Sequence, residues 1–206
     1  MPDFLTHLAI AKRYAEKNNI VGEEARDFYD GNISVDLMKN KNDAHYRKPA
    51  PEKLTIENLN KDRIDFNKFF TENKIETFFE KGILLHLIVD NYCYPIVLDS
   101  QRFLQEIEKG VRARAVIIKT FNSVANYLRT RYEIDFDMTS KKKEIEEKLI
   151  IWDKQHIGTE FDTELNLLDT PEAIKKLDDF IELSSNINIE AFISNKGQAE
   201  INLTKS

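Results

Sequence analysis

The sequence predicts an all-α protein: residues 1–206 forming one helical bundle. Its length suits one ordinary domain. Glycine and proline are scarce, with six and five in the chain, whereas all-β domains need more turn residues. Apolar residues recur at helical rather than alternating spacing. The composition, 41% hydrophobic with thirteen Phe and seven Tyr, provides enough apolar surface for a sizeable, aromatic-rich core.

The first part of the chain is expected to hold two helices followed by a long loop. Apolar spacing predicts a helix over Asp3–Lys17, which the two asparagines at 18–19 would end. A shorter helix is predicted over Glu23–Tyr29, with Gly31 as the residue that terminates it. Residues 31–61 have little periodicity and are expected to form a loop. A loop of that length in a compact domain is often functional.

The middle of the chain is expected to supply the centre of the bundle. Residues Asp62–Phe79 have a helical apolar pattern. The segment Lys81–Tyr94 is apolar nearly all round, which favours a central buried helix. Pro95 is expected to end or kink that helix. One long helix or two should then follow over Ser100–Tyr132, with a break near Gly110.

The last part of the chain has clear helix start signals. Residues 139–140, Thr and Ser, are expected to cap a charged helix over Lys141–Gln155. Pro171 stands at a natural first position for a helix over Glu172–Leu183. The polar tail, residues 196–206, is expected to be frayed.

Composition narrows the range of functions. The net charge of −6 and the pI of about 5.4 argue against a broad nucleic-acid-binding face. The lone cysteine, Cys93, cannot form an internal disulfide. The N-terminus lacks the apolar stretch of a signal peptide, and no apolar run is long enough for a transmembrane segment. We therefore expect a cytoplasmic protein.

The four histidines are the main candidates for chemistry. Three of them have a carboxylate four residues away: Asp3 and His7, His86 and Asp90, His156 and Glu160. On a helix, residues four apart share one face. Both side chains can then bind one metal ion, or the acid can orient the imidazole. The fourth histidine, His45, lies in the predicted loop.

The pair His86 and Asp90 is the most informative, because it interrupts an otherwise apolar helix. A buried aspartate costs several kcal/mol unless it is paired or binds a cation. Two interpretations remain open: a metal site, or a buried His–Asp hydrogen bond without metal. For the other histidines, the alternatives are exposed side chains and, at His156 and Glu160, a solvent-facing ion pair.

Four blocks of sequence, taken in order, resemble the zinc-dependent phospholipase C family. They are Met1–His7 (MPDFLTH), Gly31–Asp36 (GNISVD), His45, and His86–Asp90 (HLIVD). Together they cover roughly residues 1–98. The resemblance implies an all-α bundle related to single-strand-specific nucleases. It also implies a cluster of zinc ions, held by His and Asp, that activates water to cleave phosphate esters.

The resemblance implies particular ligands, carried over by position. Asp36, His45, His86 and Asp90 would hold the first metal. Asp36 would bridge to a second metal, which the resemblance places with the pair at 156 and 160, and Asp90 would bridge to a third near His7.

Two positions depart from the family pattern. Secreted family members use the amine of a processed N-terminal tryptophan as a ligand. This chain has Met1 there, and Asp3 is our candidate for the substitute ligand. Many relatives also carry a histidine where this chain has Tyr94.

The sequence therefore favours a metal-dependent hydrolase of phosphoric esters, acting on a small-molecule or lipid phosphoester. One to three Zn²⁺ ions are expected, and Mn²⁺ or Fe is permitted by the ligand types. Asp36 or an activated water would be the base or nucleophile, and Arg47 and Lys48 could contact a phosphate. One alternative is a non-catalytic interaction or regulatory protein that keeps the fold and at most one metal. Another is a metallo-hydrolase of a different class, such as an amidohydrolase-like enzyme.

Overall fold

The computed structural model describes residues 4–49, 52, 53, 55, 63–97, 99–111, 113–156 and 166–197, without the side chains of 41, 42, 94, 95, 114 and 152–156. Within these residues the regular structure is helical. The described residues form no strand, and their β-type pairing is one isolated antiparallel bridge between Arg47 and Ile64. The predicted all-α fold class is confirmed.

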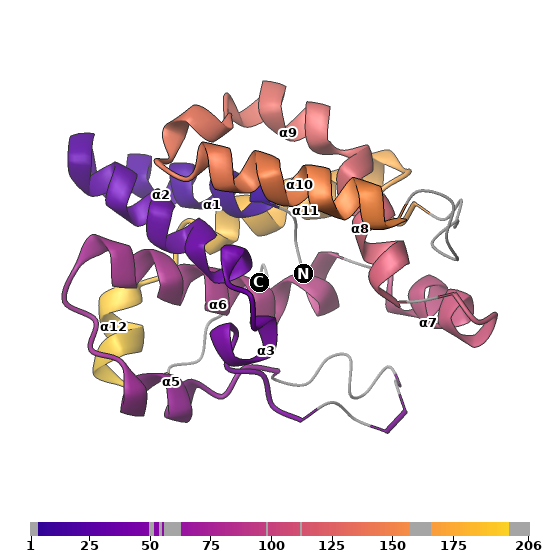
Figure 1. Ribbon diagram of the computed structural model, residues 1–206, viewed down its shortest axis with the longest axis horizontal. Helices are drawn as coiled ribbons and strands as arrows, with labels where there is room; N and C mark the ends of the chain where they lie inside the picture. The colour runs from indigo at the N-terminus through magenta and orange to yellow at the C-terminus, as the bar shows by residue number, and fades with distance from the viewer. Residues whose placement is uncertain are drawn as a thin grey trace.

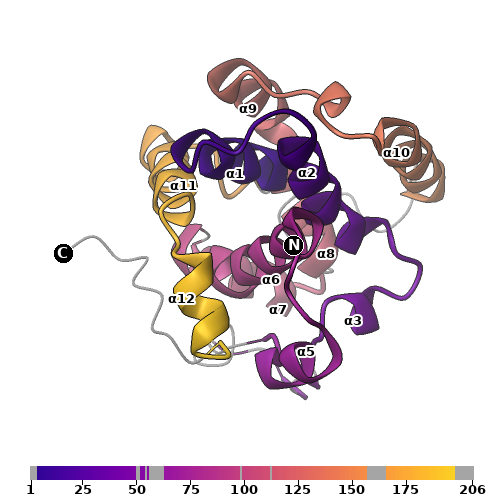
Figure 2. The same ribbon diagram turned by 90° about the vertical axis from the view of Figure 1, so that its left-hand side faces the viewer.

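The helices surround one central helix, α6. In order along the chain they are α1 (Phe4–Lys17), α2 (Gly22–Leu37), α3 (Lys41–Ala44), α5 (Phe66–Glu72), α6 (Phe78–Val97), α7 (Ser100–Glu108), α8 (Ala113–Ser123), α9 (Ala125–Tyr132), the 3₁₀ helix η1 (Phe136–Met138), α10 (Lys142–His156), α11 (Pro171–Ser184) and α12 (Ile189–Ser194). Figure 1 shows α6 running beneath α1 and α2. Figure 2 looks nearly along α6, with α1, α2, α11 and α12 around it, and these four helices contact it.

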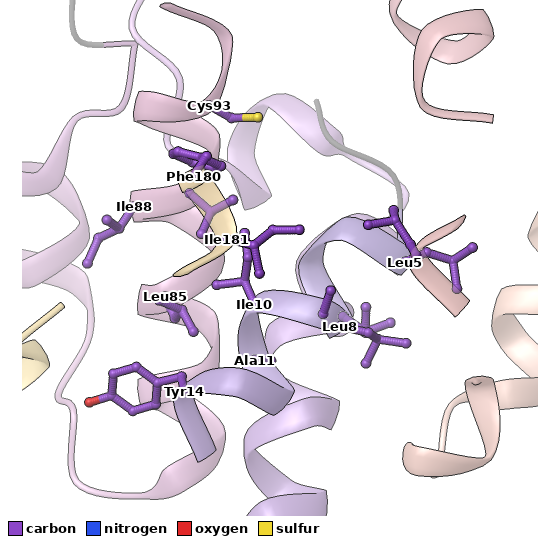
Figure 3. Close-up of a cluster of buried hydrophobic side chains, with 14 of the residues drawn as sticks. Leu5, Leu8, Ile10, Ala11, Tyr14, Leu85, Ile88, Cys93, Phe180 and Ile181 are labelled. Carbon is purple, nitrogen blue, oxygen red and sulfur yellow. The ribbon is translucent and has the colours of Figure 1, made fainter. Parts of the chain in front are cut away.

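The core lies where α1, α6 and α11 meet. Figure 3 shows Ile10 of α1 and Leu85 and Ile88 of α6 beside Phe180 and Ile181 of α11, and each of the five is fully buried. Burying a side chain of this size stabilises a fold by about 1.5–3 kcal/mol. The middle of α6 is apolar all round because other helices pack against it on every side: α1, α2, α11 and α12. None of the helices described is both long enough and apolar enough to cross a bilayer.

Helices α2 and α6 touch backbone to backbone at two glycines. A Cβ atom on Gly31 would lie 1.8 Å from the carbonyl oxygen of Phe79, and one on Gly82 would lie 2.1 Å from that of Phe28. The side-chain amide of Asn32 also donates to the Gly82 carbonyl at 3.3 Å. This crossing admits no side chain at either glycine.

The predicted end of the second helix was wrong for this reason. Gly31 does not terminate a helix, because α2 continues through it to Leu37. The glycines with positive φ are Gly22, Gly110 and Gly197 among the described residues, so Gly31 is present for close approach and not for a left-handed turn. The predicted loop over 31–61 is therefore wrong for residues 31–37, and also for the short helix α3.

The predicted helix over Asp62–Phe79 is also wrong as one element. In the described part, α5 begins after Asp65, whose side chain accepts from the backbone N–H of Lys68. It ends at Asn73, whose amide donates to the Phe69 carbonyl and to the Tyr46 hydroxyl. These side-chain hydrogen bonds satisfy backbone groups at both ends, so residues 73–77 can separate α5 from α6.

Two further boundaries differ from expectation. Helix α6 runs two residues past Pro95, to Val97. The break near Gly110 is confirmed, with φ +91° at that residue, but a second break at Val124 separates α8 from α9.

The predicted start signals of the later helices are confirmed. The Thr139 hydroxyl accepts from the Lys141 N–H at 2.7 Å, just before α10. The carboxylate of Asp30 on α2 accepts from the backbone N–H of Ser140 at 2.7 Å and also from its hydroxyl. Pro171 opens α11, and Thr170 caps it. Asp30 thereby ties the start of α10 to α2. Of the predicted frayed tail, residues 198–206 lie outside the described part.

Replacing Gly31 with alanine should destabilise the protein by about 3 kcal/mol or more, because the new methyl group would overlap the Phe79 carbonyl. This is opposite in sign to the usual preference for alanine inside a helix. The free energy of unfolding can be measured by urea titration followed by far-UV circular dichroism.

Gly110→Ala is the matched control. A Cβ there meets nothing within 4 Å, so only the positive φ opposes it. The expected cost is about 1–2 kcal/mol. If Gly31→Ala were as stable as the parent protein, α2 and α6 could not cross as closely as described.

Candidate metal centre

Five chemically active side chains from four segments meet beside the α2–α6 crossing. His7 comes from α1, Asp36 from the last turn of α2, and His45 from the residue after α3. His86 and Asp90 come from successive turns of α6. The histidines are 0% exposed, Asp36 is 4% exposed and Asp90 is 6% exposed. Buried polar groups in such number require partners.

Three other potential ligand atoms gather around the Nε2 atom of His45. It lies 3.4 Å from His86 Nε2, 3.5 Å from Asp36 Oδ1 and 3.5 Å from Asp90 Oδ2. His86 Nε2 lies 3.8 Å from the same Asp90 oxygen. Ligand atoms around a tetrahedral zinc ion, each about 2.0–2.1 Å from the metal, are about 3.3 Å from one another. The measured separations are close to that value.

A metal cation explains this arrangement better than hydrogen bonds between the side chains do. An imidazole nitrogen carries at most one N–H, and a single N–H can point to only one of the three atoms around His45 Nε2. A cation between the four donor atoms would bind all of them at once. Asp36, His45 and His86 form one of the two groups of side chains whose ligand atoms lie within 4.8 Å of one another.

The second group contains His7, His86 and Asp90. His7 Nε2 lies 3.4 Å from Asp90 Oδ1, while the rings of His7 and His86 stack with centroids 3.8 Å apart. Both ring nitrogens of His7, His86 Nδ1 and Asp90 Oδ1 are buried without a hydrogen-bond partner. Such orphaned atoms need an explanation, and a bound ion is one. The two carboxylate oxygens of Asp90 face different histidines. Oδ1 lies near His7, and Oδ2 lies near His45 and His86.

The electrostatics favour the protonation states that metal ligands need. Burial, together with the neighbouring His7, lowers the pKa of His86 to about 3, so its imidazole is neutral at physiological pH. Burial alone would raise the pKa of Asp90, but the contacts with His7 and His86 hold it below its usual range. A neutral imidazole and an ionised carboxylate are the forms that coordinate metals.

Further polar side chains border the cluster. Lys148 of α10 donates to the backbone carbonyl of Asp36 at 2.5 Å, at the C-terminal end of α2. Arg47 Nη2 lies 3.9 Å from Asp90 Oδ2. The sequence had indicated Arg47 as a candidate, but it gave no signal for Lys148. Lys148 stands at no diagnostic spacing from a ligand and reaches the cluster through tertiary structure.

The structure thus brings together five of the eight predicted ligands. The ligands predicted at Asp3 and Glu160 lie outside the described residues. The backbone of His156 ends α10, and its side chain, like that of Tyr94, is not described. The first predicted metal therefore has all four of its proposed side chains together, and the third has His7 beside Asp90.

Comparison with known proteins finds no match: neither a family model, nor a curated protein, nor a solved structure matches this chain. The case for a metal centre therefore rests on the residues and their geometry.

Asp90→Asn should lower zinc affinity by more than about 100-fold, because it removes a ligand of the second group whose other carboxylate oxygen also faces His45 and His86. Mutation of residues that only support a metal ligand already costs about 10–100-fold. Protein purified without chelator or metal-affinity resin should contain at least one equivalent of metal by elemental mass spectrometry. The variant should contain much less.

Asp30→Asn provides the matched control. Asp30 is a buried carboxylate on α2 that holds Ser140 instead of facing the histidines. Its variant should lose some stability and keep full metal content. A parent protein that is folded yet neither contains metal nor takes up added zinc would make the cluster a purely hydrogen-bonded one.

Proposed function

We propose that this protein is a metal-dependent hydrolase of phosphoric esters that resembles the zinc-dependent phospholipase C family. Asp36, His45, His86 and Asp90 would hold one ion, and His7 would contribute to another beside Asp90. The observation that carries the proposal is the convergence of three imidazoles and two carboxylates in a buried cluster, with separations around His45 Nε2 near those of a tetrahedral zinc site.

A divalent ion bound there would supply Lewis-acid activation of water and would neutralise charge on phosphoryl oxygens. The protein's own contribution is orientation and proton transfer. The carboxylate of Asp36 lies next to the histidines and is the candidate to accept a proton from the attacking water. Lys148 holds the Asp36 backbone, which fixes where that carboxylate stands. Stacking against His7 restricts the rotation of the His86 ring.

One observation favours the non-catalytic alternative. The three histidines have no exposed surface and the two aspartates have very little. Structural zinc sites are closed by protein ligands, whereas catalytic sites keep a position for water or substrate. A closed site of this kind would suit an interaction or regulatory protein that keeps a structural metal.

His86→Ala should abolish hydrolysis of chromogenic phosphate esters by the zinc-loaded protein, with a loss of at least about 100-fold, because both groups lose a ligand. The rate should be measured with a phosphomonoester and a phosphodiester. Circular dichroism should show that the variant remains helical.

Cys93→Ala is a suitable control on the same helix. Cys93 is buried on α6 but belongs to neither ligand group, so turnover should persist. Stoichiometric zinc without turnover of either ester would reject the hydrolase and support the structural-metal alternative.

A further inference from the structure

Arg47 reaches from solvent to the buried cluster of ligands. Its side chain is 37% exposed, yet its Nη2 atom lies 3.9 Å from Oδ2 of Asp90, whose side chain is 4% exposed. The three histidines of the cluster have no exposed surface at all. Arg47 is therefore a cation in contact with water at one end and with the buried carboxylate at the other.

The oxygen that Arg47 approaches is the same one that faces two of the histidines. Oδ2 of Asp90 lies 3.5 Å from His45 Nε2 and 3.8 Å from His86 Nε2. A metal ion held by these two imidazoles would take this oxygen as its carboxylate ligand. The guanidinium group and the metal ion therefore require the same oxygen atom.

An unusual backbone conformation at Tyr46 brings both neighbouring residues, His45 and Arg47, to Oδ2 of Asp90. Tyr46 has a φ of +49°, in the left-handed region that non-glycine residues rarely adopt. Its hydroxyl accepts from the side-chain amide of Asn73 at 2.7 Å. Strain of this kind persists only where the surrounding structure maintains it, and it is frequent at functional sites.

The backbone of Arg47 is also attached to the turn of α6 that carries Asp90. Arg47 forms the antiparallel bridge with Ile64. The side-chain carbonyl of Asn91, the residue after Asp90, accepts from the backbone N–H groups of Arg63 and Ile64 at 2.8 Å and 3.1 Å. The start of the Arg47 side chain is thus fixed beside Asp90, while its partly exposed end can rotate into water.

A guanidinium group and a metal ion oppose each other when both lie at one carboxylate oxygen. A second positive charge next to the ion raises the free energy of the loaded state. Arg47 can avoid this repulsion by rotating into solvent, but it then loses its contact with Asp90. Metal binding therefore carries the cost of displacing Arg47.

We propose that Arg47 is a built-in counter-ion that competes with the metal ion for Asp90. Without metal, the guanidinium balances the buried carboxylate. When an ion binds, it takes over Oδ2 and drives the Arg47 side chain into solvent. This inference requires the proposed metal centre but not the hydrolytic reaction.

The first test compares zinc affinities, measured by competition with a chromogenic chelator. Arg47→Gln should bind zinc about tenfold more tightly than the parent protein, because no cation has to be displaced. A residue that helped to hold the ion would have the opposite effect when it is replaced.

Lys48→Gln is the matched control. It removes the same charge from the next residue, whose side chain is exposed and has no contact with Asp90 among those of the described residues. Its zinc affinity should stay within about twofold of the parent value, because distant exposed charges are screened by salt.

The second test uses the reciprocity of coupled equilibria. Urea titrations should show that Arg47→Gln costs more stability in the metal-free protein than in the zinc-saturated protein. The difference should be about 1.4 kcal/mol, which is the tenfold change in affinity expressed as a free energy.

The outcomes separate this inference from the proposed function. Zinc binding that is unchanged or weaker in Arg47→Gln would overturn the competition and leave the metal centre intact. Equal strengthening in Arg47→Gln and Lys48→Gln would reduce the effect to general charge and also overturn it. If neither the parent protein nor Arg47→Gln binds zinc, the proposed metal centre fails together with this inference.

Discussion

The candidate metal centre depends on the backbone contact between α2 and α6 at Gly31 and Gly82. Asp36 follows Gly31 by five residues and His86 follows Gly82 by four, about 6–8 Å along each helix. Side chains so near the crossing can meet only if the helices remain close. Helices ordinarily pack with their axes about 8–10 Å apart. A side chain at either glycine would separate them and draw Asp36 away from His86.

The same helix supplies both the core and the ligands. Around Leu85 and Ile88, α6 is enclosed by apolar side chains of its neighbours, and this packing supports the rigidity that a polar cluster needs. His86 and Asp90 lie in that helix at a cost in free energy, because neither can be solvated by bulk water. The orphaned atoms of His86 and Asp90 show that side chains alone do not meet that cost. This unmet cost is what makes the cluster a candidate for binding a cation.

Sequence patterns predicted the features that depend on neighbours along the chain. The helical fold class and the start of α11 at Pro171 follow from local composition and capping. So does the shared face of His86 and Asp90. The role of Gly31 could not be predicted in this way, because a glycine that ends a helix and one that admits a second backbone look alike. Only the position of Phe79, distant in sequence, distinguishes them.

Arg47 connects the two chemical states that the centre can adopt. Without a cation, its contact with Asp90 partly balances a buried negative charge. When Asp90 binds a cation, the ion balances that charge instead, and the contact with Arg47 loses its electrostatic role. The same buried carboxylate is therefore compensated by a cation in one state and by an arginine with 37% of its side chain exposed in the other.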